Sequence, residues 1–244
     1  MKLLKFFVAV LGLFLTISAQ SVFAAFVPVG PQFSIKNGSA PGGFLNVGNV
    51  RFSDFQVVIT GTVPTLPSSL LVQAGTDGSQ YGLQFNPQNF LVMPNQFLNA
   101  MLSFRIDVLP PFSPMIGVNG AEMTLTGVSF ANNGLVTIGE SLRPTTGSAP
   151  VANLSVFAGT GIPVSLQHDE KSFAQQTTLF VRKDILLVGG DPAPIGFSAA
   201  HLSEFFQLYD VVAIPEPSTT GLAILGTIGV GWIIRRRKTP LPQV

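Results

Sequence analysis

The sequence predicts an all-β protein, specifically an antiparallel β-sandwich of the jelly-roll-like kind. Charged residues make up 10% of the chain, against about 25% in typical soluble domains. Glycine and proline number 25 and 19 among 244 residues, and both are poorly tolerated inside helices. No long stretch supplies the Glu, Lys, Arg and Ala from which exposed helices are normally built. The composition therefore favours strands joined by turns.

The individual strands are predicted from apolar residues that alternate with polar ones, the pattern of a strand with one buried face. In the clearest run, apolar residues at 102, 104, 106 and 108 alternate with Ser103, Arg105 and Asp107. The same pattern occurs at 55–59 and 152–156, and further strands are expected over 32–36, 70–73, 81–85, 177–188 and 201–212. About ten short strands without helical segments between them favour a sandwich over a parallel sheet.

The stretch from residue 123 to residue 138 predicts a bulge and a hairpin. Apolar residues at 123 and 125 lie on one phase and those at 128 and 130 on the other, with Gly127 between them. A bulge at Gly127 would restore a single apolar face. Asn132-Asn133-Gly134 supplies turn residues between strand-like runs at 124–130 and 135–138. We expect these two runs to pair as a hairpin.

Residues 1–24 have the pattern of a secretory signal peptide. Lys2 and Lys5 precede an apolar run over 6–17, and Val22 and Ala24 suit the residue preferences of a cleavage site. Cleavage is expected between Ala24 and Ala25. An uncleaved N-terminal anchor is the alternative, but the apolar run is short for a membrane span.

The C-terminal region contains three features in a fixed order. Pro215-Glu216-Pro217 is followed by an uncharged, largely apolar segment over 218–234 and then by Arg235-Arg236-Arg237-Lys238. The apolar segment reaches the lower limit of about 17 residues for a spanning helix. A basic cluster beside such a helix stays cytoplasmic, so the chain before Pro215 is placed across the membrane. A tail over 239–244 follows.

This order of features resembles the PEP-CTERM sorting signal of Gram-negative bacteria that make exopolysaccharide. The resemblance covers residues 214–238, and the tail beyond them is longer than family members usually carry. It implies that Pro215, Glu216 and Pro217 are processed by an exosortase, a membrane-embedded, transpeptidase-like enzyme. It also implies an inner-membrane-anchored precursor that is then released or transferred to the cell surface or extracellular matrix. An ordinary single-pass anchor whose hinge contains two prolines is the alternative.

Residues 25–213 form the expected sandwich domain between these two signals. Residues 25–214 contain 7 Lys and Arg against 11 Asp and Glu, so the exported part has a net charge near −4. Phosphate binding needs a basic face, which argues against nucleic acid as a partner. The chain has no cysteine, and therefore no disulfide and no thiolate metal site.

Few residues of the domain point to catalysis. The two histidines, His168 and His201, are far apart in sequence, and neither a Gly-x-Ser-x-Gly elbow nor a His-Glu-x-x-His motif occurs. The polar run His168-Asp169-Glu170-Lys171 is expected to be a solvated turn, and Asp77-Gly78-Ser79 a β-turn. We therefore expect no catalytic residue, metal or cofactor. Calcium held by backbone carbonyls is the alternative that sequence does not reveal.

The aromatic residues give weak support to a sugar-stacking platform. The chain has 21 phenylalanines, two tyrosines and a single tryptophan, Trp232, which lies in the predicted membrane segment. Sugar platforms usually use Trp and Tyr, which combine an apolar face with a polar edge. Most phenylalanines are therefore expected in the core.

Together these observations predict a non-enzymatic surface or extracellular-matrix protein, associated with exopolysaccharide or biofilm as the resemblance implies. Its expected partners are the exosortase-type enzyme, exopolysaccharide and, transiently through the C-terminal helix, the membrane. The alternative is a secreted glycan-binding module or polysaccharide-acting enzyme that uses the same signal.

Overall fold

The computed structural model describes residues 26–110, 116–160, 165–191 and 198–213. These residues form fourteen strands, and none of them belongs to a helix long and apolar enough to cross a membrane. The predicted signal peptide, with its cleavage site between Ala24 and Ala25, lies outside the described residues. The predicted sorting signal over 214–238 and the tail also lie outside them.

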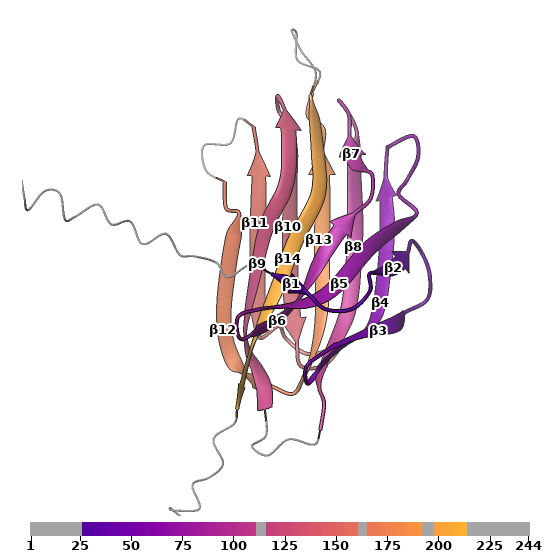
Figure 1. The fold of residues 1–244 in the computed structure, drawn as a ribbon. Helices are drawn as coiled ribbons and strands as arrows, with labels where there is room; N and C mark the ends of the chain where they lie inside the picture. Colours follow the sequence, from indigo (N-terminus) through magenta and orange to yellow (C-terminus); the bar gives the residue numbers. More distant parts are fainter. Residues whose placement is uncertain (1–25, 111–115, 161–164, 192–197, 214–244) are drawn as a thin grey trace, which may run out of the picture.

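The strands form two antiparallel sheets packed face to face, which confirms the predicted sandwich (Figure 1). The order in the larger sheet is strands 1, 5, 6, 14, 9 and 12, with strand 2 beside strand 5 and strand 7 beside strand 14. These strands are β1 (Val27–Pro28), β2 (Phe33–Lys36), β5 (Ser69–Asp77), β6 (Gln80–Pro87), β7 (Phe90–Val92), β9 (Ile116–Ala131), β12 (His168–Gln176) and β14 (Ala199–Ala213).

The smaller sheet has six strands in the order 11, 10, 13, 8, 4 and 3. It contains the strands whose alternation was clearest in the sequence. These strands are β3 (Gly42–Val47), β4 (Val50–Gly61), β8 (Phe97–Val108), β10 (Leu135–Arg143), β11 (Ala152–Gly159) and β13 (Thr178–Val188).

The chain crosses repeatedly between the two sheets, which makes the sandwich jelly-roll-like. Among the described strands, only β3 with β4, β5 with β6, and β10 with β11 are neighbours both along the chain and in a sheet. β14 runs through the middle of the larger sheet, between β6 and β9 (Figure 1). It ends at Ala213, so the predicted sorting signal begins directly after a central strand.

The hairpin predicted around Asn132-Asn133-Gly134 is wrong. β9 belongs to the larger sheet and β10 to the smaller one, so the turn carries the chain from one sheet to the other. Both edges of β9 are already occupied, by β14 and β12, which leaves no edge for β10. The turn residues themselves behave as expected, because Asn132 has a φ of 46°.

The bulge predicted at Gly127 is confirmed. The register between β9 and β14 shifts on both sides of the pair formed by Gly127 and Glu204. Asp77-Gly78-Ser79 is likewise confirmed as a turn, with a φ of 58° at Gly78 between β5 and β6.

The solvated turn predicted for His168-Asp169-Glu170-Lys171 is wrong, because these residues begin β12, an edge strand of the larger sheet. The segment contains almost no apolar residue, so it offers no alternating apolar face. Its strand geometry comes from pairing with the backbone of β9. Three short strands, β1, β3 and β7, were also not predicted.

The core lies between the sheets and is built from the inward-facing phase of each strand. In β8, Leu102, Phe104 and Ile106 are all buried, as their alternation predicts. Phenylalanines from both sheets fill much of this layer, and the rings of Phe85 and Phe205 stack with centroids 4.7 Å apart. The buried phenylalanines among the described residues are Phe52, Phe55, Phe85, Phe90, Phe104 and Phe205.

Candidate functional site

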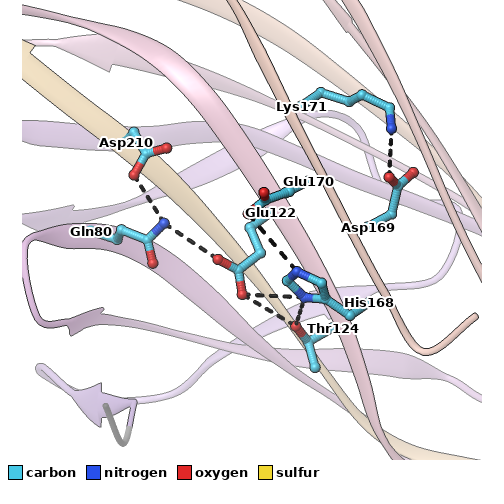
Figure 2. Close-up of polar contacts among 8 residues, drawn as sticks. All are labelled: Gln80, Glu122, Thr124, His168, Asp169, Glu170, Lys171 and Asp210. Atoms are coloured by element: carbon cyan, nitrogen blue, oxygen red, sulfur yellow. Dashed lines mark hydrogen bonds and ion pairs between the residues drawn. The ribbon is translucent and has the colours of Figure 1, made fainter. Parts of the chain in front are cut away.

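Polar side chains gather on the outer face of the larger sheet, and we call this group the acid cluster (Figure 2). Neighbouring residues on a strand point to opposite faces, and Ala121 and Met123 of β9 are buried. Glu122 between them therefore points outward. Three further strands contribute to the same surface. The members of the acid cluster are Gln80 on β6, Glu122 on β9, His168 and Glu170 on β12, and Asp210 on β14.

The carboxylates of the acid cluster are held by neighbouring side chains (Figure 2). Gln80 Nε2 donates to Glu122 Oε2 at 3.4 Å and to Asp210 Oδ1 at 2.9 Å. The other oxygen of Glu122, Oε1, lies 3.5 Å from His168 Nδ1 and 3.5 Å from the hydroxyl of Thr124. Both oxygens of Glu122 thus have partners within the fold.

Asp210 is accommodated by the glycine opposite it. Gly120 is its register partner on β9, and a Cβ added at Gly120 would lie 2.2 Å from Asp210 Oδ2. The side chain of Asp210 therefore lies over Gly120. This contact belongs to the packing of the sheet face and leaves the carboxylate directed at Gln80.

The run from 168 to 171 is divided between two surfaces. His168 and Glu170 lie on the outer face, with His168 Nε2 4.0 Å from Glu170 Oε2. Asp169 points the other way and accepts a hydrogen bond from the Ser155 backbone amide of β11 at 2.8 Å. Lys171 lies 2.7 Å from Asp169 Oδ1. The two acids, Asp169 and Glu170, do not converge on one point, as the alternation of a strand requires.

The two histidines of the domain belong to different surroundings. His201, on β14, lies 3.4 Å from the Ser129 hydroxyl and lines a mainly apolar pocket of about 410 Å³ at Val63, Leu91 and Met93. Across the described ranges, no three His, Cys, Asp or Glu side chains come close enough to hold a metal ion.

A groove of about 470 Å³ lies on the outer face of the smaller sheet. We call it the arginine groove, and define it by Asp54, Arg105, Arg143, Phe180 and Arg182. Phe180 on β13 pairs with Arg105 of β8 on one side and with Arg143 of β10 on the other. An aromatic ring therefore lies in a row between two guanidinium side chains on adjacent strands. Three of the seven Lys and Arg residues in the stretch 25–214 line this groove.

The charges in the arginine groove are close to balanced. Arg105 Nη1 lies 3.3 Å from Asp54 Oδ2, and Arg105 Nε donates to Asp107 Oδ2 at 2.7 Å. Arg182 lies 3.6 Å from Asp184, with both side chains more than half exposed. The groove therefore presents guanidinium donors and carboxylate acceptors side by side, which is the chemistry that hydroxyl-rich ligands require.

A backbone irregularity places Asp54 in the groove. The register between β4 and β8 shifts between Ser53 and Gln56, and Asp54 has a φ of 58°. Positive φ is uncommon outside glycine but is best tolerated by Asn and Asp. The shift lets Phe52 and Phe55 both reach the core while Asp54 is directed at Arg105.

The sequence contained part of the signal for this groove. The alternation along β8 correctly predicted an outward Arg105. It could not show that β8 and β13 are neighbours, because strands far apart in the chain pair according to the whole fold.

The predicted processing residues Pro215, Glu216 and Pro217, and the cations Arg235, Arg236, Arg237 and Lys238, lie outside the described residues.

Comparison with known proteins adds no functional assignment. No protein-family model and no curated protein matches the chain. A native family 12 xyloglucanase from Bacillus licheniformis is similar over 75% of this chain and 100% of its own, at 12% identity and a TM-score of 0.27. A GH31 alpha-xylosidase from Xanthomonas citri is similar over 78% of this chain and 28% of its own, at 7% identity and a TM-score of 0.19. Similarities this low carry no argument about function.

Proposed function

We propose that the chain is an exported, non-enzymatic surface or matrix protein that is sorted through its C-terminal signal and binds exopolysaccharide. The observation that carries the proposal is the order of Pro215-Glu216-Pro217, the apolar segment and the basic cluster directly after β14. A proline-bounded segment is kept out of helix, and a processing enzyme binds its substrate as an extended strand. Glu216 adds a carboxylate that resists entry into the bilayer.

The acid cluster favours a structural role over hydrolysis. Glycoside hydrolysis usually needs two carboxyl groups that face one bond across a cleft. Here Glu122 is hydrogen-bonded through both oxygens, and Asp210 is held by Gln80. These contacts stabilise the sheet face and leave the two carboxyl groups engaged with protein partners.

The arginine groove is the surface we assign to exopolysaccharide. A sugar ring resting on Phe180 would place its hydroxyls beside Arg105 and Arg143, the register neighbours of Phe180. Asp54 and Asp184 supply acceptors on the same face, so the groove suits a neutral polysaccharide better than a strongly acidic one. Phenylalanine gives the apolar contact, and the polar groups fix the orientation.

The sorting step is tested by Glu216→Ala in a host that carries an exosortase-type enzyme. Full-length protein is expected to accumulate in the inner membrane, while export and folding stay unchanged. Gln243→Ala, in the tail, is the matched control and should leave the membrane at the wild-type rate. If Glu216→Ala also leaves at the wild-type rate, the motif is only a linker and the sorting mechanism fails.

Polysaccharide binding is tested by pull-down on the cell's own exopolysaccharide and on purified neutral and acidic polysaccharides. Phe180→Ala should weaken binding to neutral chains about tenfold, which corresponds to about 1.4 kcal/mol. Phe44→Ala is the matched control, since Phe44 is exposed and also lies beside an arginine, with Arg51 5.3 Å from its ring centre. A panel of glycosidase and esterase substrates completes the test, because turnover of any of them contradicts a non-enzymatic role.

A further inference from the structure

Three polar side chains are buried in the middle of the apolar core. Glu140 is 4% exposed, and Lys183 and Gln207 are fully buried. Each occupies an inward-facing position of its strand, because the residues two positions before and after it are buried and apolar. Glu140 lies on β10, Lys183 on β13 and Gln207 on β14. These flanking residues are Ile138, Leu142, Val181, Ile185, Phe205 and Tyr209. We call Glu140, Lys183 and Gln207 the core triad.

The core triad joins the two sheets at one amine. Glu140 and Lys183 are direct register partners in the smaller sheet, and Lys183 Nζ contacts Glu140 Oε2. Gln207 enters from the larger sheet, with its Oε1 2.5 Å from Lys183 Nζ. The amine nitrogen therefore lies between a carboxyl group and a carboxamide group.

The triad is buried, and its surroundings are largely apolar. Lys183 Nζ lies 6.0 Å and 5.9 Å from the ring centres of Phe85 and Phe205, and 3.5 Å from Met123 Sδ. Burial lowers the pKa of the Lys183 amine well below its ordinary value. Burial thus favours the neutral form of the amine, and the neutral form is the nucleophilic one.

An ion pair alone leaves two atoms of the triad unexplained. Among the described residues, neither Gln207 Nε2 nor Glu140 Oε1 has a hydrogen-bond partner. A buried polar atom without a partner costs about 1–3 kcal/mol, and natural cores usually avoid it. Gln207 Nε2 is the group that would leave in a reaction between Lys183 and Gln207, and Glu140 Oε1 belongs to the carboxyl group that contacts the Lys183 amine through its other oxygen.

We propose that Lys183 and Gln207 form an intramolecular isopeptide bond across the sandwich, with Glu140 as the proton carrier. Lys183 Nζ attacks Cδ of the Gln207 carboxamide, and Glu140 accepts the proton that the nitrogen loses. Glu140 then returns a proton to Gln207 Nε2, which leaves as ammonia. One C–N bond forms and one breaks, no electron is transferred, and the chain becomes lighter by one ammonia, about 17 Da.

Glu140 is the proton carrier and not the acyl partner for a specific reason. It is the one buried carboxyl group in the part of the chain that the structure describes. If Glu140 itself were consumed in a link to Lys183, no other buried acid of the described core would carry the proton. A link to Gln207 also joins the two sheets, whereas Glu140 and Lys183 already belong to adjacent strands of one sheet.

The bond would fasten the strand that leads to the C-terminus. Gln207 lies on β14, six residues before its end at Ala213, and the bond would fix β14 covalently to β13 of the opposite sheet. Force applied to the C-terminal segment would then reach β13 through a covalent bond as well as through hydrogen bonds. This inference does not depend on the proposed polysaccharide binding or sorting.

Peptide mapping by mass spectrometry of the full chain, purified from cells, tests the proposal. Cleavage after glutamate separates the peptide over 171–204, which contains Lys183, from the peptide that begins at Phe205 and contains Gln207. The expected product is these two peptides joined, with a loss of about 17 Da. The same two peptides found separate and at full mass, from folded wild-type protein, would overturn the proposal.

Three variants assign the roles. Lys183→Arg and Glu140→Gln should each give the two peptides unlinked, whereas the matched control Lys171→Arg should keep the link. If the variants of the triad fail to fold, the wild-type map still decides. A link from Lys183 to Glu140 with a loss of about 18 Da, one water, would instead overturn the assignment to Gln207.

Discussion

At the scale of single residues, Tyr209 places a phenol hydroxyl group inside the apolar core. Its ring is fully buried beside Phe52, with ring centres 5.9 Å apart, and its hydroxyl has no hydrogen-bond partner among the described residues. Burial raises the pKa of the Tyr209 phenol well above its ordinary value. The phenol therefore stays neutral in the folded protein at a pH where it ionises in the unfolded chain.

We predict that Tyr209 contributes to a loss of stability at alkaline pH. Above about pH 10, where an unfolded tyrosine ionises, the folded state binds more protons than the unfolded state. The free energy of unfolding then falls as the pH rises, by about 1.4 kcal/mol per pH unit for this one group. In Tyr209→Phe this part of the alkaline fall in unfolding free energy should be absent. The stability of the variant at neutral pH should be unchanged or slightly higher. Urea unfolding from pH 8 to pH 11 measures both, and an unchanged alkaline slope in the variant would contradict the assignment.

A second prediction concerns Gly43 on β3. Its φ is +75°, and a Cβ added there would lie 2.1 Å from Phe33 Cζ. Gly43→Ala should therefore cost about 1–3 kcal/mol of stability from backbone strain, with further loss if Phe33 moves away from Phe55. The matched control is Gly139→Ala, because nothing lies within 4 Å of the Cβ position there. Thermal unfolding compares the two, and equal stabilities would show that the loop around Gly43 rearranges freely.

At the scale of strands, β12 is held at the sandwich edge by backbone pairing with β9 and also by side-chain contacts to the opposite sheet. The Asp169 carboxylate links it to the β11 backbone in the opposite sheet, 2.8 Å from the Ser155 amide nitrogen. Burial alone would raise the pKa of Asp169, but the hydrogen bonds from Lys171 and from the Ser155 amide outweigh it and lower the pKa. The charged form of Asp169 thus favours the folded state.

We predict that Asp169→Asn weakens the domain at neutral pH and flattens its acid response. A carboxyl group whose pKa is lower in the folded protein than in the unfolded chain stabilises the fold when the pH is above the unfolded-chain pKa. For aspartate that pKa is about 3.9. That contribution is lost as the pH falls through the folded pKa. The variant should lose about 1 kcal/mol at pH 7 and show a smaller decline between pH 5 and pH 2. Asp184→Asn, at an exposed ion pair, is the control, and an equal loss there would argue against a specific role for Asp169.

Sequence periodicity predicted those strands that have one apolar face and missed those that do not. β8, β11 and the part of β4 over 55–59 alternate between buried and outward residues, so burial of one face fixes both their structure and their orientation. β12 has no apolar face to alternate, and its pairing with β9 is set by the rest of the fold. The turn at 132–134 was identified correctly, but the sheet entered after it was not, because turn residues fix local backbone angles and not the choice of partner strand.

The candidate sites show the same division between local and non-local information. Alternation along residues 177–188 places Lys183 on the buried phase, and the same applies to Glu140 and Gln207 in their own strands. Each inward polar residue could therefore have been noticed from sequence alone. That the three meet at one point depends on two sheets facing each other in a given register. The row of Arg105, Phe180 and Arg143 depends in the same way on the order of β8, β13 and β10.

At the scale of the whole molecule, stability is expected to come from packing and not from a bound metal. The chain has no cysteine, and its described side chains form no group of three or more metal ligands. We predict that a chelator leaves the thermal unfolding of the full chain unchanged and cooperative. A loss of cooperative unfolding on adding the chelator, restored by calcium, would show a site built from backbone carbonyls.

We proposed from the sequence signals at the two ends that the domain is exported and sorted. Mass spectrometry of the terminal peptides of protein recovered from the cell surface or matrix tests both ends together. Sorting predicts a mature N-terminus at Ala25 and a C-terminus within or next to Pro215-Glu216-Pro217. The basic cluster over 235–238 should then be absent from the mature protein and present only in the membrane-bound precursor. A surface-exposed protein that keeps all residues through Val244 would contradict processing, and with it the proposed sorting function.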